Sequence, residues 1–323
     1  MASAWDAGRV SERIHEDEPD TSESVVRALL RAELPHWAES HVECLATSGT
    51  DNAMWRIRTN DGPDVVVRLP RRPAAAANVL GETSVLQQLQ AAEIGSVVRT
   101  PRVVHVGQPH ERFAHHWSVL EWIDGVDAWT ARTALGRRNS NALAAELATA
   151  VAAIGGADIA GATERMPGSR GGPLGPLLER LDSWLTLPAW NATGLVDVAA
   201  VRRLAAEAHE IVDEPVAAGF VHGDLIPGNL LVARGHLTSI IDWGGAGRGD
   251  VAQDLAPAWA VLTNVERPAF KEAVGVSEAA WIRGRTFELE HAVGGVLYYV
   301  PKKHPLGDVM ARTLQRILAS PRA

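Results

Sequence analysis

The sequence predicts an α+β protein in which a small antiparallel sheet precedes a larger, mainly helical part. Three short segments near the N-terminus alternate apolar with polar residues, as half-buried strands do: 42–47, 54–58 and 65–69. From Val126 onward, most apolar residues recur at helical spacing. We therefore expect two lobes, 23–122 and 123–323, after a polar, acidic and poorly ordered stretch at 1–22.

Further elements are expected around the three strands. A helix is predicted at 24–34, because its apolar positions have helical spacing and Pro35 follows them. A second helix is predicted at 75–92, and two more strands at 97–106 and 117–123. The last of these strands ends in an Asp-Gly pair, which marks the end of the first lobe.

The second lobe is predicted to be built from helices around one hairpin. The expected helices are 141–154, 177–187, 198–216, 251–263, 267–274, 279–300 and 306–318. A Gly- and Pro-rich stretch at 155–175 is expected to be a mobile loop. The apolar runs 230–232 and 240–241 flank Arg234-Gly235-His236, a short turn with the glycine that a β-hairpin needs.

Composition excludes several classes of protein. The net charge of −8 argues against a nucleic-acid partner, because such domains usually carry a basic face. No run reaches the roughly 18 apolar residues of a membrane helix, and the first residues lack the apolar core of a signal peptide. A single cysteine, Cys44, allows no intramolecular disulfide framework. We expect a cytoplasmic monomer or homodimer with no membrane partner.

The hairpin is expected to bring three oxygen-bearing side chains together. Asp224 and Asn229 precede its first strand, and Asp242 follows its second strand. Because the two ends of a hairpin meet, these side chains should lie within a few ångströms of one another. Carboxylate and amide oxygens suit a hard divalent cation such as Mg²⁺.

The order and spacing of these residues narrow the interpretation. Asp224 and Asn229 form D-x-x-x-x-N, and the His-Gly-Asp that includes Asp224 stands where protein kinases carry H-R-D. The Asp-Trp-Gly that begins at Asp242 stands where they carry D-F-G. With Gly in place of Arg and Trp in place of Phe, the stretch 220–256 resembles the aminoglycoside phosphotransferase family. That family has a bilobal, protein-kinase-like fold.

The resemblance implies an ATP-dependent O-phosphotransferase, with GTP as the alternative nucleotide. Asp224 would take or orient the proton of the acceptor hydroxyl, while Asn229 and Asp242 would hold Mg²⁺. The implied acceptor is an aminoglycoside-like or other antibiotic, which would make the protein a resistance enzyme. A metabolic kinase for an amino alcohol, amino acid or sugar is an open alternative, as is a nucleotide-binding pseudokinase.

The resemblance also places a nucleotide on the first lobe. The residues implied for it are Ser48, Gly49, Thr50, Arg68, Glu82, Leu120, Glu121, Trp122 and Ile123. Arg68 stands where the kinase fold carries a lysine, and no lysine occurs before Lys271. A guanidinium can also grip phosphate, with stricter geometry. Glu82, on the helix expected at 75–92, is the candidate acid that pairs with Arg68. From the residues alone, Arg68 also fits a solvated strand residue, Glu82 a surface acid, and the loop at 48–50 a plain turn.

The acceptor is expected to bind near the helices that follow the hairpin. Candidate contacts there are Asp250, Trp259, Glu288 and Tyr298. Acids would favour a polyamine such as an aminoglycoside, whereas aromatic side chains would favour a bulkier acceptor such as a macrolide. Both kinds are present, and aromatic residues at helical spacing are also typical of a core.

Two other classes of function fit part of the pattern. A metallohydrolase could use His222, Asp224 and Asp242 as ligands, but it would want further ligands and would leave Asn229 unexplained. A binding protein without catalysis is favoured by the arginine at position 68, although it would not need the complete set of acid and metal ligands.

Overall fold

The computed structural model describes residues 18–45, 51–60, 62–92, 94–134, 141–188 and 194–320. The chain forms two compact units. The first unit comprises Met1–Ala91 and Thr100–Asp124, and the second comprises Ala92–Arg99 and Gly125–Ala323. Each unit is described by itself.

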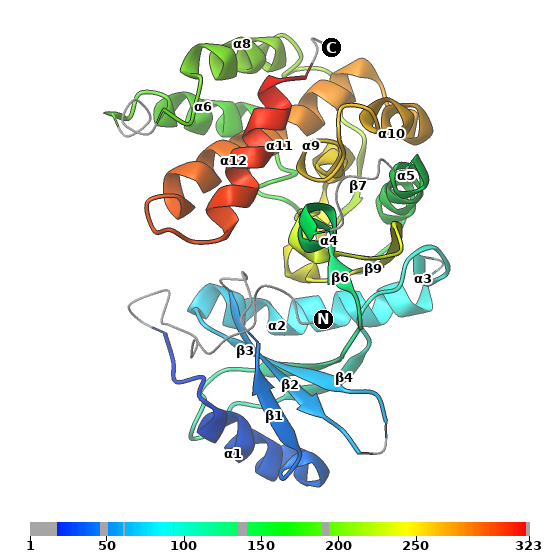
Figure 1. Cartoon of the computed structure of the whole chain (residues 1–323), viewed down its shortest axis with the longest axis vertical. Helices are drawn as coiled ribbons and strands as arrows, with labels where there is room; N and C mark the ends of the chain where they lie inside the picture. The colour runs from blue at the N-terminus through cyan, green and yellow to red at the C-terminus, as the bar shows by residue number, and fades with distance from the viewer. Residues whose placement is uncertain are drawn as a thin grey trace. The chain divides into compact units, whose positions relative to one another are not determined.

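The first unit contains a five-stranded antiparallel sheet with the strand order β1-β2-β3-β5-β4 (Figure 1). Its strands are β1 (His41–Cys44), β2 (Asn52–Arg58), β3 (Val65–Pro70), β4 (Val103–Gly107) and β5 (Trp117–Glu121). All six residues of the central strand β3 are buried. The antiparallel sheet predicted from alternating residues is therefore confirmed.

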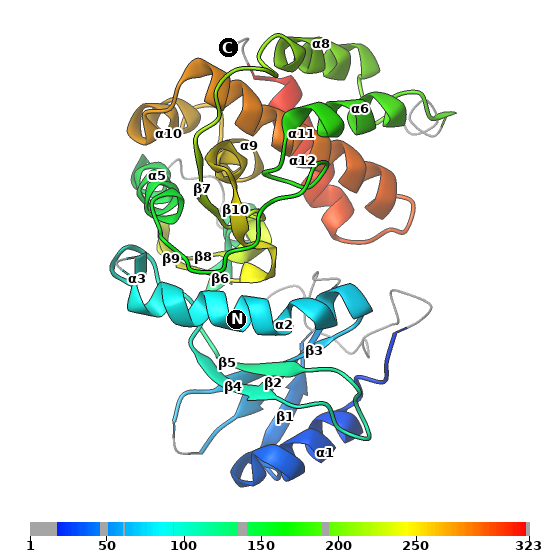
Figure 2. The same cartoon turned by 180° about the vertical axis from the view of Figure 1, so that it is seen from behind.

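Two helices cover opposite faces of this sheet (Figure 2). Helix α1 (Glu23–Glu33) buries Val25, Val26, Leu29 and Leu30 in one cluster with Val67 and Leu69 of β3. Because side chains alternate along a strand, Arg68 points to the other face, where α2 (Pro73–Ala91) packs. This alternation determines which helix Arg68 meets.

The strand predicted at 97–106 is wrong in its first half. Residues Ile94–Val97 form the short helix α3, which belongs to the second unit, and β4 begins only at Val103. Pro101 lies between them and has no N–H to donate to a strand ladder, so the strand begins after it.

The second unit is mainly helical. The other helices among its described residues are α4 (Ala128–Ala134), α5 (Asn141–Gly155), α6 (Leu174–Trp184), α8 (Val198–His209), α9 (Pro257–Ala260), α10 (Arg267–Val274), α11 (Glu278–Tyr299) and α12 (Leu306–Leu318). The long α11 packs against α12, α6 and α8 and is buried along most of its length. The single helix predicted at 251–263 is instead a 3-10 helix, Val251–Leu255, followed by α9, because Pro257 starts a new helix.

The predicted hairpin is confirmed. Strands β8 (Leu230–Ala233) and β9 (His236–Ile240) are joined by Arg234 and Gly235, which both have positive φ as a tight two-residue hairpin turn requires. Two small sheets frame it. One adds β6 (Val126–Asp127) to the hairpin, and the other pairs β7 (Ala218–Val221) with β10 (Gly247–Asp250). In the described residues, no helix is both long and apolar enough to cross a membrane.

Gly107 provides a test of packing in the first unit. It lies opposite Trp117 in the β4–β5 pair, and a Cβ there would come within 1.9 Å of the indole. Because Trp117 is fully buried, we expect Gly107→Ala to lower the free energy of unfolding by about 1–3 kcal/mol. Urea denaturation measures this loss. In the control, Gly62→Ala, the new Cβ lies 3.9 Å from its nearest neighbour, so a change beyond about 0.5 kcal/mol is not expected. Equal losses of stability in the two variants would contradict the close packing of Gly107 against Trp117.

Candidate active site

The backbone after β7 is held by one buried carboxylate. Asp254 accepts hydrogen bonds from the backbone N–H of His222 at 2.6 Å and of Gly223 at 2.8 Å. It is 2% exposed, and burial raises its pKa against the lowering effect of these two backbone donors. Both oxygens of Asp254 are therefore used to fix the loop that leads to Asp224.

His222 links this loop to the end of the hairpin. The ring is fully buried. Its Nδ1 accepts a hydrogen bond from the backbone N–H of Asp224 at 3.2 Å, and its Nε2 donates to the carbonyl of Ile241 at 3.1 Å. These two bonds require the neutral ring, and burial lowers the pKa of His222, which favours the same form. His222 is thus a fixed connection in the site.

Asn229 joins the same parts through its side chain and backbone. Its Nδ2 donates to the carbonyl oxygen of Asp224 at 2.9 Å and to the Asp224 carboxylate at 3.1 Å. Its own carbonyl accepts from the N–H of Ile241 at 2.9 Å. Because both partners of Nδ2 are acceptors, the amide orientation is determined, and its oxygen faces away from Asp224.

Asp242 follows Ile241 directly and has an uncommon backbone conformation. Its φ of 63° and ψ of 68° lie in the left-handed region. The next residue, Trp243, is buried, packs edge-on against His222 at 4.5 Å, and donates from Nε1 to the carbonyl of Ile240 at 3.0 Å. The buried indole holds the strained residue in place, a feature that is common at functional sites.

The side chains of Asn229 and Asp242 offer an amide oxygen and a carboxylate, and Mg²⁺ takes oxygen ligands of this kind together with phosphate oxygens. Over the described residues, no group of three or more His, Cys, Asp and Glu side chains could hold a metal ion. This part of the chain therefore does not provide the richer ligand set that the metallohydrolase alternative requires.

Arg170 is a site residue that the sequence interpretation missed. Its Nη1 donates to Oδ1 of Asp224 and lies 3.4 Å from Nε2 of His291. Burial acts to raise the pKa of Asp224, but the charge and the hydrogen bond of Arg170 lower it below its usual value. Asp224 is therefore an ionised carboxylate at neutral pH.

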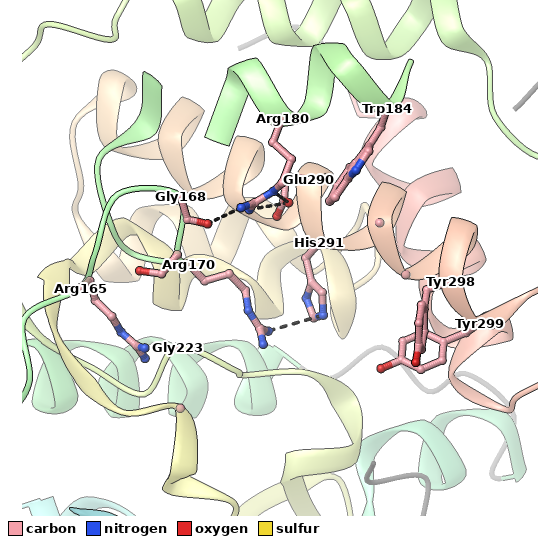
Figure 3. A pocket seen from close by; sticks show the side chains of 14 residues that line it. Arg165, Gly168, Arg170, Arg180, Trp184, Gly223, Glu290, His291, Tyr298 and Tyr299 are labelled. Atoms are coloured by element: carbon pink, nitrogen blue, oxygen red, sulfur yellow. Dashed lines mark hydrogen bonds and ion pairs between the residues drawn. The ribbon is translucent and has the colours of Figure 1, made fainter. Parts of the chain in front are cut away.

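A cavity of about 520 Å³ lies in the second unit beside this loop (Figure 3). Gly223 and Gly245 form one side of it. The other walls come from the segment that carries Arg170, from α6 and from α11. Because Arg170 binds Asp224 and also lines the cavity, a small molecule bound there would lie next to that carboxylate.

The predicted acceptor contacts separate into two groups. Tyr298 lines the cavity and is 44% exposed. Trp259 is 1% exposed and packs on Trp281 with ring centroids 4.8 Å apart. Asp250 is also buried, and it accepts hydrogen bonds from the Arg283 Nε at 2.8 Å and the backbone N–H of Ala252 at 3.0 Å. Neither of these two residues lines the cavity.

Glu288 is also outside the cavity wall. It is 1% exposed, although Glu290 and His291 on the next part of α11 do line the cavity. A helical pattern of apolar and charged residues does not show which side of a helix meets a cavity and which meets a core. The sequence therefore could not separate Glu288 from Glu290.

The segment 155–175, predicted to be a mobile loop, is hydrogen-bonded along β10. Arg165 donates its N–H to the carbonyl of Arg248 at 2.8 Å, and Arg248 donates to Thr163 at 2.9 Å. Asp250 donates to the carbonyl of Gly171 at 2.8 Å. These bonds position Arg165 and Arg170 at the cavity. The only signal in the sequence was two arginines in a Gly-rich segment.

In the first unit, the structure contains the ion pair between Arg68 and Glu82 that was expected from the sequence. Both side chains are buried. Ser48, Gly49 and Thr50 lie outside the described residues.

The segment 120–123, which the resemblance implies for the nucleotide, lies at the end of β5. Leu120 and Ile123 are buried. The N–H of Glu121 donates to the carbonyl oxygen of Arg102 at 2.8 Å, and the N–H of Trp122 donates to the carbonyl oxygen of Asp64 at 2.9 Å. Arg56 lies over the Trp122 ring, 4.2 Å from its centroid.

Comparison with known proteins identifies the class of the molecule. Its fold is that of kinase-like antibiotic phosphotransferases. The GDP complex of wild-type aminoglycoside 2′-phosphotransferase-IIIa is 17% identical, with 91% of this chain and 97% of that chain covered and a TM-score of 0.66. Macrolide 2′-phosphotransferase MphH from Brachybacterium faecium is 19% identical, with 92% and 99% covered and a TM-score of 0.60.

A family model described as the phosphotransferase enzyme family matches residues 43–287, and the chain belongs to that family. The resemblance inferred from the His-Gly-Asp and Asp-Trp-Gly stretches is thereby confirmed, and the protein is identified as a phosphotransferase. No curated protein matches the sequence.

The buried neutral ring of His222 should make stability depend on pH. Its pKa in the folded protein lies below the ordinary value of 6.5, so the unfolded chain binds a proton that the folded chain does not. The stability is complete above pH 6.5 and falls as the pH drops below it. Between about pH 7.5 and 5.5 we expect a loss of roughly 1 kcal/mol from this residue.

Urea denaturation of the protein and of His222→Gln at both pH values measures this contribution. The variant should show a smaller difference between the two pH values than the unaltered protein, whatever its absolute stability. The control His41→Gln changes an exposed residue of β1 and should keep the full difference. The same difference in all three proteins would show that His222 is not the source.

Proposed function

We propose that this protein transfers the γ-phosphate of ATP, with GTP as the alternative donor, to a hydroxyl group of a small molecule. The observation that carries the proposal is the pair of hydrogen bonds from the Asn229 amide to Asp224, continued by the bond between Asn229 and Ile241. These bonds connect the ionised Asp224, the side chain of Asn229 and the backbone that directly precedes Asp242. Phosphoryl transfer requires mainly positioning and neutralisation of charge.

Asp224 is the proposed base. Its Oδ1 binds Arg170 and its Oδ2 binds Asn229, but each carboxylate oxygen has two lone pairs, so Asp224 can still accept a bond from the acceptor hydroxyl. The acceptor oxygen forms a bond to the γ-phosphorus, and the bond from that phosphorus to the leaving nucleoside diphosphate breaks. The hydroxyl proton passes to Asp224 and then to solvent.

Asn229 and Asp242 are the proposed ligands of Mg²⁺, the first through its amide oxygen and the second through its carboxylate. When bound, the ion would neutralise charge on the phosphate oxygens. The buried ring of Trp243, packed edge-on against His222, and the two bonds of His222 support the backbone at Asp242 in its left-handed conformation.

The first unit provides the proposed nucleotide contacts, namely Ser48, Gly49, Thr50, Arg68, Glu82 and the segment Leu120, Glu121, Trp122, Ile123. A guanidinium has five N–H donors, so the pairing of Arg68 with Glu82 is compatible with phosphate binding. Among the described residues, the N–H of Ile123 donates no hydrogen bond, which makes it the best placed of the four to meet a base edge.

The acceptor is proposed more broadly. Solved structures with this fold include complexes with kanamycin, gentamicin and hygromycin B, so an antibiotic acceptor and a role in resistance are one proposal. A metabolic hydroxyl compound is the other. Sequence identities of 14–19% support the shared fold only, and the chemistry of this chain's own cavity must distinguish the two. A cytoplasmic location and a monomer or homodimer belong to the same proposal.

Asp224→Asn tests the catalytic role. Without a basic carboxylate, we expect phosphate transfer to fall by at least about 100-fold, while Mg²⁺-nucleotide binding is kept. Release of ADP is measured across aminoglycosides, macrolides, small amino alcohols and hydroxy acids. The control Asp182→Asn changes an exposed acid near His209 and should keep full activity. Tight Mg²⁺-nucleotide binding with no turnover of any acceptor would favour the pseudokinase.

Arg170→Gln tests the electrostatic role of Arg170. Since the charge of Arg170 lowers the pKa of Asp224, its removal raises that pKa, and activity should be lost at a higher pH on the acid side of the profile. The profile of kcat/KM against pH measures this shift. The control Arg248→Gln removes a guanidinium whose side chain is 52% exposed and should leave the profile unchanged. An unchanged acid limb in Arg170→Gln would refute the role.

A further inference from the structure

We propose that the acceptor of this enzyme carries an anionic group, a carboxylate or a phosphate, which Arg165 binds beside Asp224. The proposal rests on the function proposed above and deepens it by naming the class of acceptor. It differs from the polyamines kanamycin and gentamicin, which are bound in two of the similar solved structures.

The side chain of Arg165 lies in a bed made by glycines. A Cβ on Gly249 would lie 2.8 Å from its Cγ, a Cβ on Gly247 would lie 3.1 Å from its Nε, and a Cβ on Gly223 would lie 2.4 Å from its Nη2. The side chain therefore runs along β10 and ends against the loop that holds Asp224, on the wall of the cavity (Figure 3). Any larger residue at these positions would move it.

The guanidinium of Arg165 has no acidic partner among the residues that the structure describes. Its Nε is buried without a hydrogen bond. The two carboxylates whose charges reach it are those of Asp254 and Asp224, and both are bound elsewhere. Burial and the charge of Arg170 lower the pKa of Arg165, and the charges of Asp254 and Asp224 offset this only in part. An anion from the ligand would supply the missing partner.

The other charged groups on the described part of the cavity wall are paired. Arg170 binds Asp224, and the acid Glu290 is bound by Arg180 with an Nη2–Oε1 distance of 2.6 Å. At the end of α11, Lys302 lies over the ring of Tyr298, 3.4 Å from its centroid. A polyamine would have to displace an arginine from Glu290 or from Asp224.

The aromatic part of the cavity wall indicates the chemical character of the rest of the acceptor. Trp184, Tyr298 and Tyr299 line the same cavity. Its volume of about 520 Å³ is that of an ordinary small-molecule site. Aromatic walls and a guanidinium together fit a hydroxy acid, or a phosphorylated alcohol, with a planar or apolar body.

The same guanidinium could instead bind the phosphoryl group that is being transferred. Both ligands offer anionic oxygens, so geometry alone does not separate them. If the nucleotide were the source, substitution of Arg165 would weaken the binding of a nucleotide analogue. If the acceptor is the source, it would weaken only the binding of anionic acceptors.

Calorimetric binding of simple probes tests the proposal directly. Benzoate and phenyl phosphate should bind at least about 10-fold more tightly than neutral benzamide, and Arg165→Gln should remove that preference, a loss of about 10- to 100-fold. The matched control Arg248→Gln removes an exposed guanidinium from β10 and should keep the preference. Equal binding of benzoate and benzamide by the unaltered protein, or equal effects of the two substitutions, would overturn the proposal.

Kinetics with a matched pair of acceptors provide the second arm. For para-(hydroxymethyl)benzoate, Arg165→Gln should raise KM and leave kcat nearly unchanged, whereas for para-(hydroxymethyl)benzamide neither constant should change. The affinity for Mg²⁺ with AMP-PNP should also be unchanged, and a loss there would assign Arg165 to the nucleotide and overturn the proposal. If benzoate is still preferred but no acceptor receives phosphate, the anion site stands and the proposed phosphotransfer fails.

Discussion

The candidate active site depends on one buried ring that must stay neutral. His222 accepts a hydrogen bond at one nitrogen and donates one at the other, and in this way connects the N–H of Asp224 to the carbonyl of Ile241. A second proton would break the bond to Asp224, because that nitrogen would become a donor. Burial keeps the ring neutral. Trp243 packs against this ring and directly follows Asp242, whose backbone has the left-handed conformation. The position of both aspartates therefore follows from one desolvated side chain.

Around this ring, arginine–carboxylate pairs determine where negative charge is available. Arg170 binds Asp224, and Arg180 binds Glu290. Arginine remains charged at any physiological pH, so the positive member of each pair keeps its charge. Asp224 is therefore kept ionised, which a base needs, while the acid on the cavity wall is neutralised. Arg165 is the exception, since it contributes charge to the cavity without an acidic partner among the described residues.

The sequence predicted those parts of the fold that local chemistry determines. The hairpin followed from a two-residue turn with a glycine, and the pairing of Arg68 with Glu82 from the resemblance to the kinase fold. Segment 155–175 could not be predicted, because its position depends on backbone bonds to β10, about 80 residues further on. Local composition identified it as a loop and gave no indication that it would carry two arginines to the cavity.

The glycine of the His-Gly-Asp stretch differs from the arginine of protein kinases for a reason that the structure supplies. Gly223 has a φ of +80°, and a Cβ there would come within 2.7 Å of the carbonyl oxygen of Gly245 as well as meeting the Arg165 guanidinium. A side chain is thus excluded by conformation and by space. Position 223 carries no guanidinium, but the guanidinium of Arg165, which comes from another segment, lies beside it on the cavity wall. The departure from the kinase motif and the charge of the acceptor site are therefore two aspects of one packing arrangement.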